Sequence, residues 1–450
     1  MNILLLGLGA VSRTLLLILK RKKPGFLGKG PTLTIVDKED RRGLISALAL
    51  GELFRDVSFV RAEIDATNVT NLDRIITMRR IGLFVDATYG IRTVELLRLL
   101  DAHGIPYINS SVEEWDILPG AKGDDPNADS LSKRQVEIES LRGSFRSQAT
   151  SLLDMGVNPG LISAMTKRAV RGFHRRVFGA EAGADIAAAA QRLDVRAAVI
   201  TELDCQVTAR PRRRGEFVNT WSPDGYIEEA FSPAEYTDRG VGVVINPVRS
   251  YYNTVYSRVP SQTYVGYAVR HSEAITIGKL LQGSAPAPPA TVFYAYQSCD
   301  ASLASLFEIQ NSPGYKYTSK RHPTDDITDG TDEVGILLQT PGHGSYWCGT
   351  VQSIHDARKL FPGYESLINA STVQTAAGYY AGIAWIVSHP RLGVIYPEAL
   401  PDDFVFDTVG DLIAPLYDGP IAFDITEKPS RRLDGKDPIS EPFSFDSYLV

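Results

Sequence analysis

The sequence has few cysteines and no pairing pattern among them: Cys205, Cys299 and Cys348 are widely spaced along 450 residues. They have neither metal-site spacing nor an even count, so we expect no disulfide framework, no metal site and a reducing compartment. Cys205 or Cys348 as a nucleophile is an open alternative. A small buried hydrophobic residue is the more common role of a lone cysteine.

A hydrophobic run of about 18 residues that would cross a membrane is also lacking. No positive charge precedes the first apolar residues, Arg13 interrupts them and the Lys/Arg cluster follows them, which is unlike a secretory signal. Positive charge is not in excess, since 47 basic residues face 53 acidic ones for a net charge of −6. The short basic run Arg210–Arg214 is interpreted as a solvated loop. We therefore expect a cytoplasmic protein that binds neither membrane nor nucleic acid.

The first part of the chain is organised around a turn between a strand and a helix. Asn2–Gly7 is apolar and predicts a strand, and Arg13–Lys23 predicts a helix. A strand that runs into Gly-x-Gly-x-x-small and then a helix is the arrangement that holds a pyrophosphate. The first glycine permits the turn, and the second lets a dinucleotide approach the N–H groups at the helix start. The residues expected to contact NAD here are Gly7, Gly9, Ala10, Val11 and Ser12.

Acidic and polar residues follow the next predicted strands. Asp37 ends the strand Thr32–Val36, where a carboxylate accepts the ribose hydroxyls of NAD and repels the 2′-phosphate of NADP. Three further strand-helix units disfavour the alternative of a strand-turn-helix that binds nothing. The carboxyl edge of the resulting sheet would bring Asp65 to the adenine, and Asp86, Thr88 and Asn109 to the nicotinamide ribose. The last three also suit capping of the following helix.

From Arg196 the pattern changes to short β-runs separated by turn residues, which predicts an α+β domain with a largely antiparallel sheet. The fold class is therefore α/β, with an N-terminal Rossmann-type parallel sheet and a second α+β domain. The expected division is 1–155, 156–371 and a C-terminal helix and tail, 372–450, which packs back on the first domain. Arg134–Leu153, in the first of these domains, predicts a helical connector. Lys316–Asp332, in the second domain, predicts a polar, mobile segment.

A group of acids beside a tryptophan is the candidate site of the second domain. Glu202 and Asp204 lie in one predicted β-run, Trp221 follows a short aromatic run, and Glu228-Glu229 follow a predicted Pro223-Asp224-Gly225 turn. A ring face and carboxylates together attract the two ends of a small aliphatic diammonium ion. The alternative is that Trp221 belongs to the core and the carboxylates are solvated, which composition alone favours.

His271-Ser272-Glu273 follows a predicted strand and precedes an apolar helix, Ala274–Leu281. A histidine beside a glutamate suits proton transfer near neutral pH. The same residues suit a helix N-cap, and the sequence leaves the two interpretations even.

Four segments that span most of the chain carry a resemblance. They are Gly156-Val157-Asn158-Pro159-Gly160-Leu161, Gly215-Glu216-Phe217-Val218-Asn219-Thr220-Trp221-Ser222, His271-Ser272-Glu273-Ala274 and His389-Pro390-Arg391-Leu392-Gly393-Val394. In them the chain resembles the bacterial homospermidine synthases, within the wider saccharopine-dehydrogenase-like group. The resemblance implies tightly held NAD, a second domain that supplies dimer contacts and hence a homodimer, and putrescine as substrate. It also implies site residues: Trp221 as the cation-binding ring, Glu202 and Glu229 as pocket carboxylates, and Asn158, Glu113, His271 and Glu273 lining the active site.

The reaction that the resemblance implies joins two putrescines to sym-homospermidine and releases ammonia. Hydride passes to NAD from an amine-bearing carbon, a second amine attacks the imine, ammonia leaves and hydride returns, so a closed pocket must keep water from the imine. Spermidine as a second aminobutyl donor stays open. Two rivals remain. A saccharopine- or carboxynorspermidine-type NAD(P)H dehydrogenase would need Arg or Lys for a substrate carboxylate, and a non-catalytic NAD-binding module would only dimerise.

Overall fold

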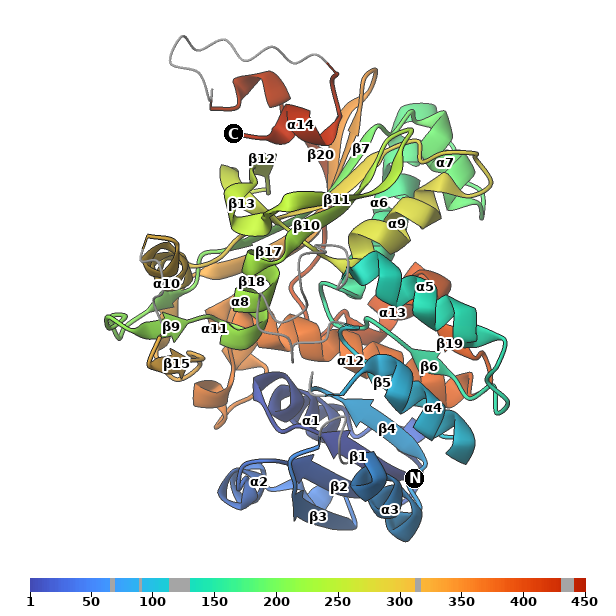
Figure 1. The fold of residues 1–450 in the computed structure, drawn as a ribbon, viewed down its shortest axis with the longest axis vertical. Helices are drawn as coiled ribbons and strands as arrows, with labels where there is room; N and C mark the ends of the chain where they lie inside the picture. The colour runs from blue at the N-terminus through green and yellow to red at the C-terminus, as the bar shows by residue number, and fades with distance from the viewer. Residues whose placement is uncertain (65–68, 89–90, 113–129, 312–316, 430–440) are drawn as a thin grey trace. The chain divides into compact units, whose positions relative to one another are not determined.

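The computed structural model describes residues 1–64, 69–88, 91–112, 130–311, 317–429 and 441–450. The chain divides into two compact units, each built from segments that are far apart in the sequence (Figure 1). Unit 1 comprises Met1–Leu118, Lys133–Leu161 and Ala357–Ile413, and unit 2 comprises Pro119–Ser132, Ile162–Asp356 and Ala414–Val450. The functional division at residues 155 and 371 stays a prediction.

Unit 1 contains a parallel sheet, which confirms the predicted Rossmann-type domain. Seven strands of the described residues lie in the order β3-β2-β1-β4-β5-β6-β19, and neighbouring strands are parallel throughout. The first six have the doubly wound order of dinucleotide-binding domains, and a late segment of the chain adds the seventh. The strands are β1 (Asn2–Leu6), β2 (Thr32–Asp37), β3 (Asp56–Arg61), β4 (Leu83–Asp86), β5 (Tyr107–Asn109), β6 (Ser151–Leu152) and β19 (Val394–Ile395).

Helices cover both faces of this sheet (Figure 1). Leu4 and Leu6 of β1 pack in a core with residues of α3 and α4, whereas Ile3 and Leu5 line a small apolar pocket with residues of α1 and α12. Because side chains alternate along a strand, a sheet covered on both faces requires strands that are apolar throughout. The helices of unit 1 are α1 (Ala10–Lys22), α2 (Arg42–Leu48), α3 (Val69–Arg79), α4 (Thr93–His103), most of α5 (Leu131–Arg142), α12 (Ala370–Ser388) and α13 (Asp402–Val409).

Small residues let helix α12 approach the backbone of unit 1 closely. A Cβ atom on Gly378 would lie 1.9 Å from the carbonyl oxygen of Gly156, and one on Gly382 would lie 2.5 Å from Cδ1 of Ile108. The helix begins with a capping box, in which Asn369 and Thr372 satisfy each other's backbone N–H groups. Glycine at these two positions is therefore a packing requirement of unit 1.

Unit 2 contains a mixed sheet that is largely antiparallel, as the sequence predicted. Its nine described strands run β11-β10-β14-β7-β17-β18-β20, and β13 pairs with both β14 and β12. Within the described part of this sheet, the β14–β7 pair alone is parallel. The strands are β7 (Ala197–Asp204), β10 (Pro233–Asp238), β11 (Gly242–Arg249), β12 (Thr254–Arg258), β13 (Thr263–Val269), β14 (Thr291–Gln297), β17 (Thr331–Thr340), β18 (Gly344–Ser353) and β20 (Tyr417–Ile421).

One face of this sheet packs on a hydrophobic core. Val199 and Leu203 of β7, Phe293 and Ala295 of β14, and Phe445 near the chain end belong to that core. The alternate residues of β7 and β14 therefore point to the opposite face. The other elements of unit 2 are α6 (Leu161–Phe178), α7 (Ile186–Arg192), α8 (Pro223–Phe231), α9 (Ser272–Gln282), α10 (Asp300–Gln310) and α14 (Phe445–Tyr448), the paired short strands β8 (Val207–Thr208) with β16 (Ile327–Asp329) and β9 (Glu216–Val218) with β15 (Ser319–Arg321), and the start of α11 (Ile354–Lys359).

Three local predictions are wrong. Pro223-Asp224-Gly225 is the first turn of α8 rather than a free-standing turn, because the Ser222 side chain accepts a hydrogen bond from the Gly225 N–H at 3.1 Å and proline suits the first helical position. The range Arg134–Leu153 is not one helix, since α5 ends and β6 follows within it. The described part of Lys316–Asp332 contains strands β15 and β16, which pair with β9 and β8.

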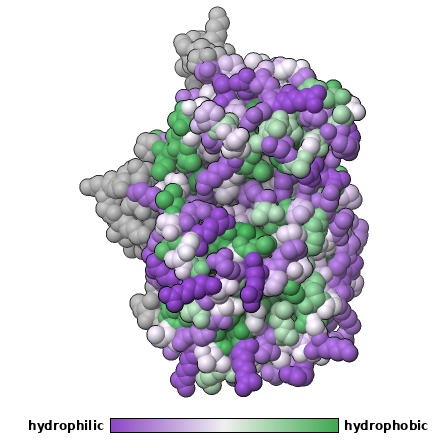
Figure 2. All heavy atoms as spheres, turned by 90° about the vertical axis from the view of Figure 1, so that its right-hand side faces the viewer, coloured by the Kyte–Doolittle hydropathy of each residue, from purple (hydrophilic) through white to green (hydrophobic). Residues whose placement is uncertain are grey.

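Figure 2 shows one face of the molecule, on which hydrophilic residues surround small groups of hydrophobic ones. Large hydrophobic side chains exposed in unit 2 include Val243 and Val248 of β11. No helix in the described ranges combines the length and the apolar character that crossing a membrane requires.

Candidate cofactor and substrate sites

The cofactor candidates of unit 1 begin at the turn from β1 to α1. Gly7 has φ +83°, and a Cβ atom on it would lie 2.5 Å from Cγ2 of Thr88, so the turn requires glycine. Gly9 is the exposed N-cap of α1, and a Cβ on it would meet nothing within 4 Å. The helix start therefore offers N–H groups and open space, as a pyrophosphate needs. The rest of the turn consists of half-buried Ala10 and Val11 and buried Ser12.

Asp37, at the end of β2, is tied to the glycine turn. Its Oδ2 atom accepts a hydrogen bond from the Leu8 N–H at 2.7 Å, and its Oδ1 atom accepts one from the Glu39 N–H at 2.8 Å. Nε of Arg41 lies 3.5 Å from Oδ2. A carboxylate has about four acceptor positions, so two backbone donors leave capacity for ribose hydroxyls. The residues at this edge thus fit NAD.

Asp86, Thr88 and Asn109 belong to one hydrogen-bond network. Oδ1 of Asp86 accepts from the Thr88 N–H at 2.9 Å and from its hydroxyl at 2.8 Å, and Oδ2 accepts from the Tyr107 hydroxyl at 3.0 Å. Nδ2 of Asn109 donates to the same hydroxyl at 3.1 Å. Burial raises the pKa of Asp86 to about 6, although the bonds from Thr88 and Tyr107 oppose the rise. The N-cap of α4 is Arg92, so the capping alternative is wrong for Asp86 and Thr88.

The substrate candidates of unit 2 gather on the face of the sheet opposite the core. Glu202 of β7 pairs directly with Tyr296 of β14, and the two-residue period puts Tyr294 on the same face. The Tyr294 hydroxyl donates to Oε2 of Glu202 at 2.7 Å, and the Tyr296 hydroxyl accepts from Nε1 of Trp221 at 3.1 Å. Two neighbouring tyrosines therefore connect the predicted carboxylate with the predicted ring.

His271 and Glu229 join this group. The His271 ring lies edge-on to Tyr294, with centroids 4.9 Å apart. Burial, followed by the negative charges of Glu202 and Glu229, raises the pKa of Tyr294 well above its usual value. Glu202 is 6% exposed and Glu229 is 7% exposed, so the alternative that these carboxylates are solvated is wrong.

Sequence reasoning missed the tyrosines of this group. Tyr294 and Tyr296 alternate with Phe293 and Ala295 in a strand that is buried along almost its whole length. A buried tyrosine needs a partner for its hydroxyl, so this alternation was the available signal. Tyr226 of α8 lies edge-on to Tyr296, with centroids 5.3 Å apart. We call the whole group the tyrosine cluster, which consists of Glu202, Trp221, Tyr226, Glu229, His271, Tyr294 and Tyr296.

The remaining predicted site residues have other surroundings. Glu273, in the first turn of α9, is buried, and its Oε1 atom accepts from the Ser163 hydroxyl of α6 at 2.6 Å. His271 occupies the N-cap position of α9, but its side chain makes no capping bond. Asn158 belongs to unit 1, in the turn before α6. Asp65 and Glu113 lie outside the described residues.

Two further acids near the tyrosine cluster have partners of their own. Glu228 accepts a hydrogen bond at 3.2 Å from Nη2 of Arg270, a side chain that is 2% exposed. This ion pair joins α8 to the end of β13, directly beside His271. Asp204 accepts from the Thr220 hydroxyl and from the Gln206 N–H, and burial raises its pKa.

The cysteines do not form a site. Cys348 is buried, as expected, but Cys205 is exposed, so the expectation of burial is wrong there. Burial of part of its surface, with the nearby Asp204 charge, raises the pKa of Cys205 to about 11, which leaves it a thiol at neutral pH. In the part of the chain that the structure describes, no three His, Cys, Asp or Glu side chains lie together as metal ligands would.

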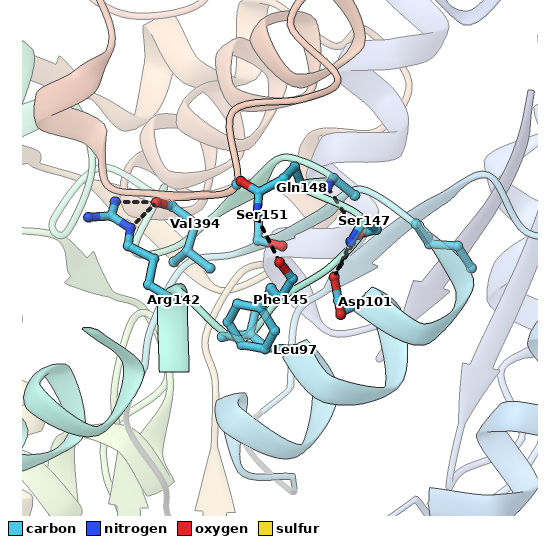
Figure 3. A pocket seen from close by; sticks show the side chains of 11 residues that line it. Leu97, Asp101, Arg142, Phe145, Ser147, Gln148, Ser151 and Val394 are labelled. Carbon is cyan, nitrogen blue, oxygen red and sulfur yellow. Dashed lines mark hydrogen bonds between the residues drawn. The ribbon is translucent and has the colours of Figure 1, made fainter. Parts of the chain in front are cut away.

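Figure 3 shows a small pocket in unit 1. It lies at the amino ends of β6 and β19, whereas the cofactor turn follows the carboxyl end of β1. Ser151 and Val394, which line it, are the first residues of β6 and β19. Nε of Arg142 donates to the Val394 carbonyl at 2.9 Å, and Asp101 accepts from the N–H and the hydroxyl of Ser147, each at 2.8 Å. These polar groups bind one another, and the bond from Arg142 ties the start of β19 to the end of α5.

Comparison with family models identifies both halves of the chain. Residues 3–152 match the saccharopine dehydrogenase NADP binding domain, and residues 156–416 match the saccharopine dehydrogenase C-terminal domain. The homospermidine synthase of Blastochloris viridis is 27% identical over an alignment of 488 positions, which covers 100% of this chain and 97% of the relative. That of Mesorhizobium japonicum is 26% identical, with 100% and 96% covered.

Solved structures agree with this assignment. The homospermidine synthase from Legionella pneumophila in complex with NAD has a TM-score of 0.84 at 25% identity, with 100% of this chain and 97% of that chain covered. Saccharopine dehydrogenase (L-Glu forming) from Saccharomyces cerevisiae shares the fold, with a TM-score of 0.52 at 11% identity and 93% and 99% covered. The chain belongs to the saccharopine dehydrogenase family.

Proposed function

We propose that this chain is a homospermidine synthase, an NAD-dependent transferase that condenses two putrescines to sym-homospermidine and releases ammonia. Two bacterial relatives and a solved bacterial enzyme, similar over their full length, support the proposal. The reaction balances without an external oxidant, because two four-carbon diamines give one eight-carbon triamine and one ammonia. NAD, when bound, supplies reversible hydride transfer.

The observation that carries the proposal is the position of Trp221 beside buried carboxylates in the tyrosine cluster. Putrescine is a dication at neutral pH, so a ring face attracts one end and a carboxylate such as Glu202 or Glu229 attracts the other. The bond from the indole N–H to Tyr296 fixes the plane of the ring. The substrate imine is also cationic when protonated, and the same ring face stabilises it without reacting with it.

The cofactor and the remaining active-site residues follow from the same proposal. Gly7, Gly9, Ala10, Val11 and Ser12 hold the pyrophosphate, and Asp37 holds the adenosine ribose. Asp65 meets the adenine, and Asp86, Thr88 and Asn109 meet the nicotinamide ribose. His271 and Glu273 transfer protons, and Asn158 and Glu113 line the active site.

We infer further that the enzyme is a cytoplasmic homodimer. The second domain would supply the dimer contacts, since β11 is an edge strand that exposes Val243 and Val248. An edge strand with exposed apolar side chains suits pairing with another chain. Light scattering after size exclusion, with a Val243→Lys, Val248→Lys variant beside the wild type, tests this inference. A dimer that is unaffected by both charges would contradict contacts through β11.

The function itself is tested by incubating the protein with putrescine and a small amount of NAD. The expected products are sym-homospermidine and ammonia in equal amounts, over many turnovers per NAD, with no build-up of NADH absorbance. NADH that forms in proportion to the amine consumed would favour a dehydrogenase. An absence of turnover would favour a non-catalytic NAD-binding module.

A further inference from the structure

Strand β14 presents two tyrosine hydroxyls to the site of unit 2 from adjacent positions on one face. Their side chains are buried, and their rings stack with centroids 5.7 Å apart. One hydroxyl donates to Glu202, and the other accepts from the Trp221 indole N–H. Each hydroxyl therefore binds one of the two side chains that are proposed to hold the diamine.

Each bond sets a different property of its partner. A glutamate has several rotatable bonds, so a donor at 2.7 Å fixes the direction in which the Glu202 carboxylate presents its charge. An indole attracts a cation only over its face, so an acceptor at Nε1 fixes the plane in which the Trp221 ring lies. Edge-on contacts with Tyr226 and His271 hold the two tyrosine rings in turn.

We propose that Tyr294 and Tyr296 are positioning residues: Tyr294 orients the Glu202 carboxylate and Tyr296 orients the Trp221 ring for a diamine. The proposal rests on the proposed function. The tyrosines act through these two partners, so removal of either hydroxyl impairs diamine use while the fold and NAD binding persist. Phenylalanine keeps the ring contacts and deletes the hydroxyl alone.

The first test measures putrescine kinetics of Tyr294→Phe and Tyr296→Phe. Tyr294→Phe should raise KM for putrescine about tenfold with a smaller change in kcat, because a hydrogen bond to a charged group in the bound state is lost. Tyr296→Phe should lower kcat/KM by a similar factor. The NAD dissociation constant, measured by calorimetry, should stay unchanged in both variants.

Tyr346→Phe is the matched control. The Tyr346 hydroxyl donates to Oδ1 of Asp418 at 2.9 Å, so this variant also removes a bond between a tyrosine and a carboxylate in unit 2. Neither residue belongs to the tyrosine cluster. The control should resemble the wild type in putrescine kinetics, whatever its melting temperature. Equal kinetic losses in the control and in Tyr294→Phe would mean a general packing role and would overturn the proposal.

Double-mutant cycles test whether each tyrosine acts through its partner. Adding Tyr296→Phe to Trp221→Phe, or Tyr294→Phe to Glu202→Gln, should cost little beyond the first change. Additive losses in kcat/KM would show that the hydroxyls act by another route, and would overturn the proposal while the proposed function stands.

Tryptophan emission tests Tyr296 independently of turnover. The contribution of Trp221 is the spectrum of the protein minus that of its Trp221→Phe version. This contribution should change in Tyr296→Phe and stay as in the wild type in Tyr346→Phe. An unchanged contribution in Tyr296→Phe overturns the role of Tyr296, even if the wild type makes no homospermidine. If the emission changes but the wild type makes no homospermidine, the proposed function is wrong and the contact by which Tyr296 positions Trp221 still holds.

Discussion

At the scale of single residues, the candidate sites of this protein are rich in buried carboxylates. Glu202, Glu229, Asp86 and Asp204 are each less than a tenth exposed, and burial of a charge is costly unless hydrogen bonds or opposite charges compensate it. Asp86 and Asp204 accept hydrogen bonds from hydroxyl and backbone N–H groups, and Glu202 accepts one from a tyrosine hydroxyl. Variants that remove the charge of one carboxylate at a time therefore distinguish the acids that stabilise the fold from those that bind the substrate.

Replacement of Asp86 by Asn should change how stability depends on pH. The folded pKa of about 6 lies above the ordinary value of 3.8, so the folded state holds more protons between these values. The free energy of unfolding therefore falls as pH rises from about 4 to 6, by on the order of 3 kcal/mol if Asp86 acts alone. Asp86→Asn lacks this loss, so its melting temperature should gain on the wild type from pH 4 to 7. A constant difference would contradict the raised pKa.

The adjacent glutamates of α8 should behave differently when each loses its charge. Glu228→Gln weakens the buried pair with Arg270 and should cost about 3 kcal/mol of stability. Glu229→Gln and Glu202→Gln should instead weaken putrescine use and leave NAD binding unchanged. Melting curves and putrescine kinetics on the three variants separate the effects. Full activity of both site variants would place the diamine pocket elsewhere.

Asp37 should set the choice of cofactor. Its carboxylate would bind the ribose hydroxyls of NAD and repel the 2′-phosphate of NADP, with a preference of roughly 2 kcal/mol or more. Asp37→Ala should narrow that preference and also weaken NAD binding, since the Leu8 N–H loses its acceptor. Asp40→Ala, which removes an exposed carboxylate paired with Arg42, is the control. Equal wild-type affinities for NAD and NADP, measured by calorimetry, would refute the assignment.

At the scale of elements, the β1–α1 turn uses its two glycines for different purposes. Gly7→Ala puts a Cβ atom at φ +83° and 2.5 Å from Thr88, so it should lower the melting temperature. Gly9→Ala meets no atom of the protein, so it should fold normally and bind NAD at least tenfold more weakly, by about 1.4 kcal/mol. A Gly9→Ala variant with unchanged NAD affinity would remove the pyrophosphate from this turn.

Secondary-structure elements were predictable where the pattern lies in one continuous segment of sequence. They were not predictable where segments far apart in the sequence pair with each other. The β1–α1 turn and the strand ending at Asp37 follow from local pattern, and so does the change to short strands after Arg196. The strand pair β6 and β19 does not, because Val394 reaches the sheet from a late part of the chain. The first turn of α8 resembled a free turn because its proline and glycine suit both.

The candidate site was predictable in part for the same reason. Glu202, Trp221, Glu229 and His271 are residue types whose chemistry fits a diamine, and the structure brings them together within unit 2. Tyr294 is 92 residues beyond Glu202, and only the parallel pairing of β7 with β14 sets Tyr296 beside that glutamate. Sequence alone does not give that register.

At the scale of the whole molecule, two units divide the work that the proposal requires. Unit 1 provides the glycine turn and Asp37 for a dinucleotide, and unit 2 provides buried acids and a ring for a dication. The chemistry demands that hydride taken from one carbon is returned within the same turnover. Retention of hydrogen is therefore the property that sets this reaction apart from one-way dehydrogenation.

The most direct measurement is the mass of the triamine made from putrescine that carries deuterium at both amine-bearing carbons, in the presence of unlabelled NAD. Deuterium removed from one carbon should return to the product, so sym-homospermidine should retain every deuterium of both donors. Products that have lost one deuterium, or labelled NADH that accumulates without a triamine, would contradict internal hydride return and with it the proposed function.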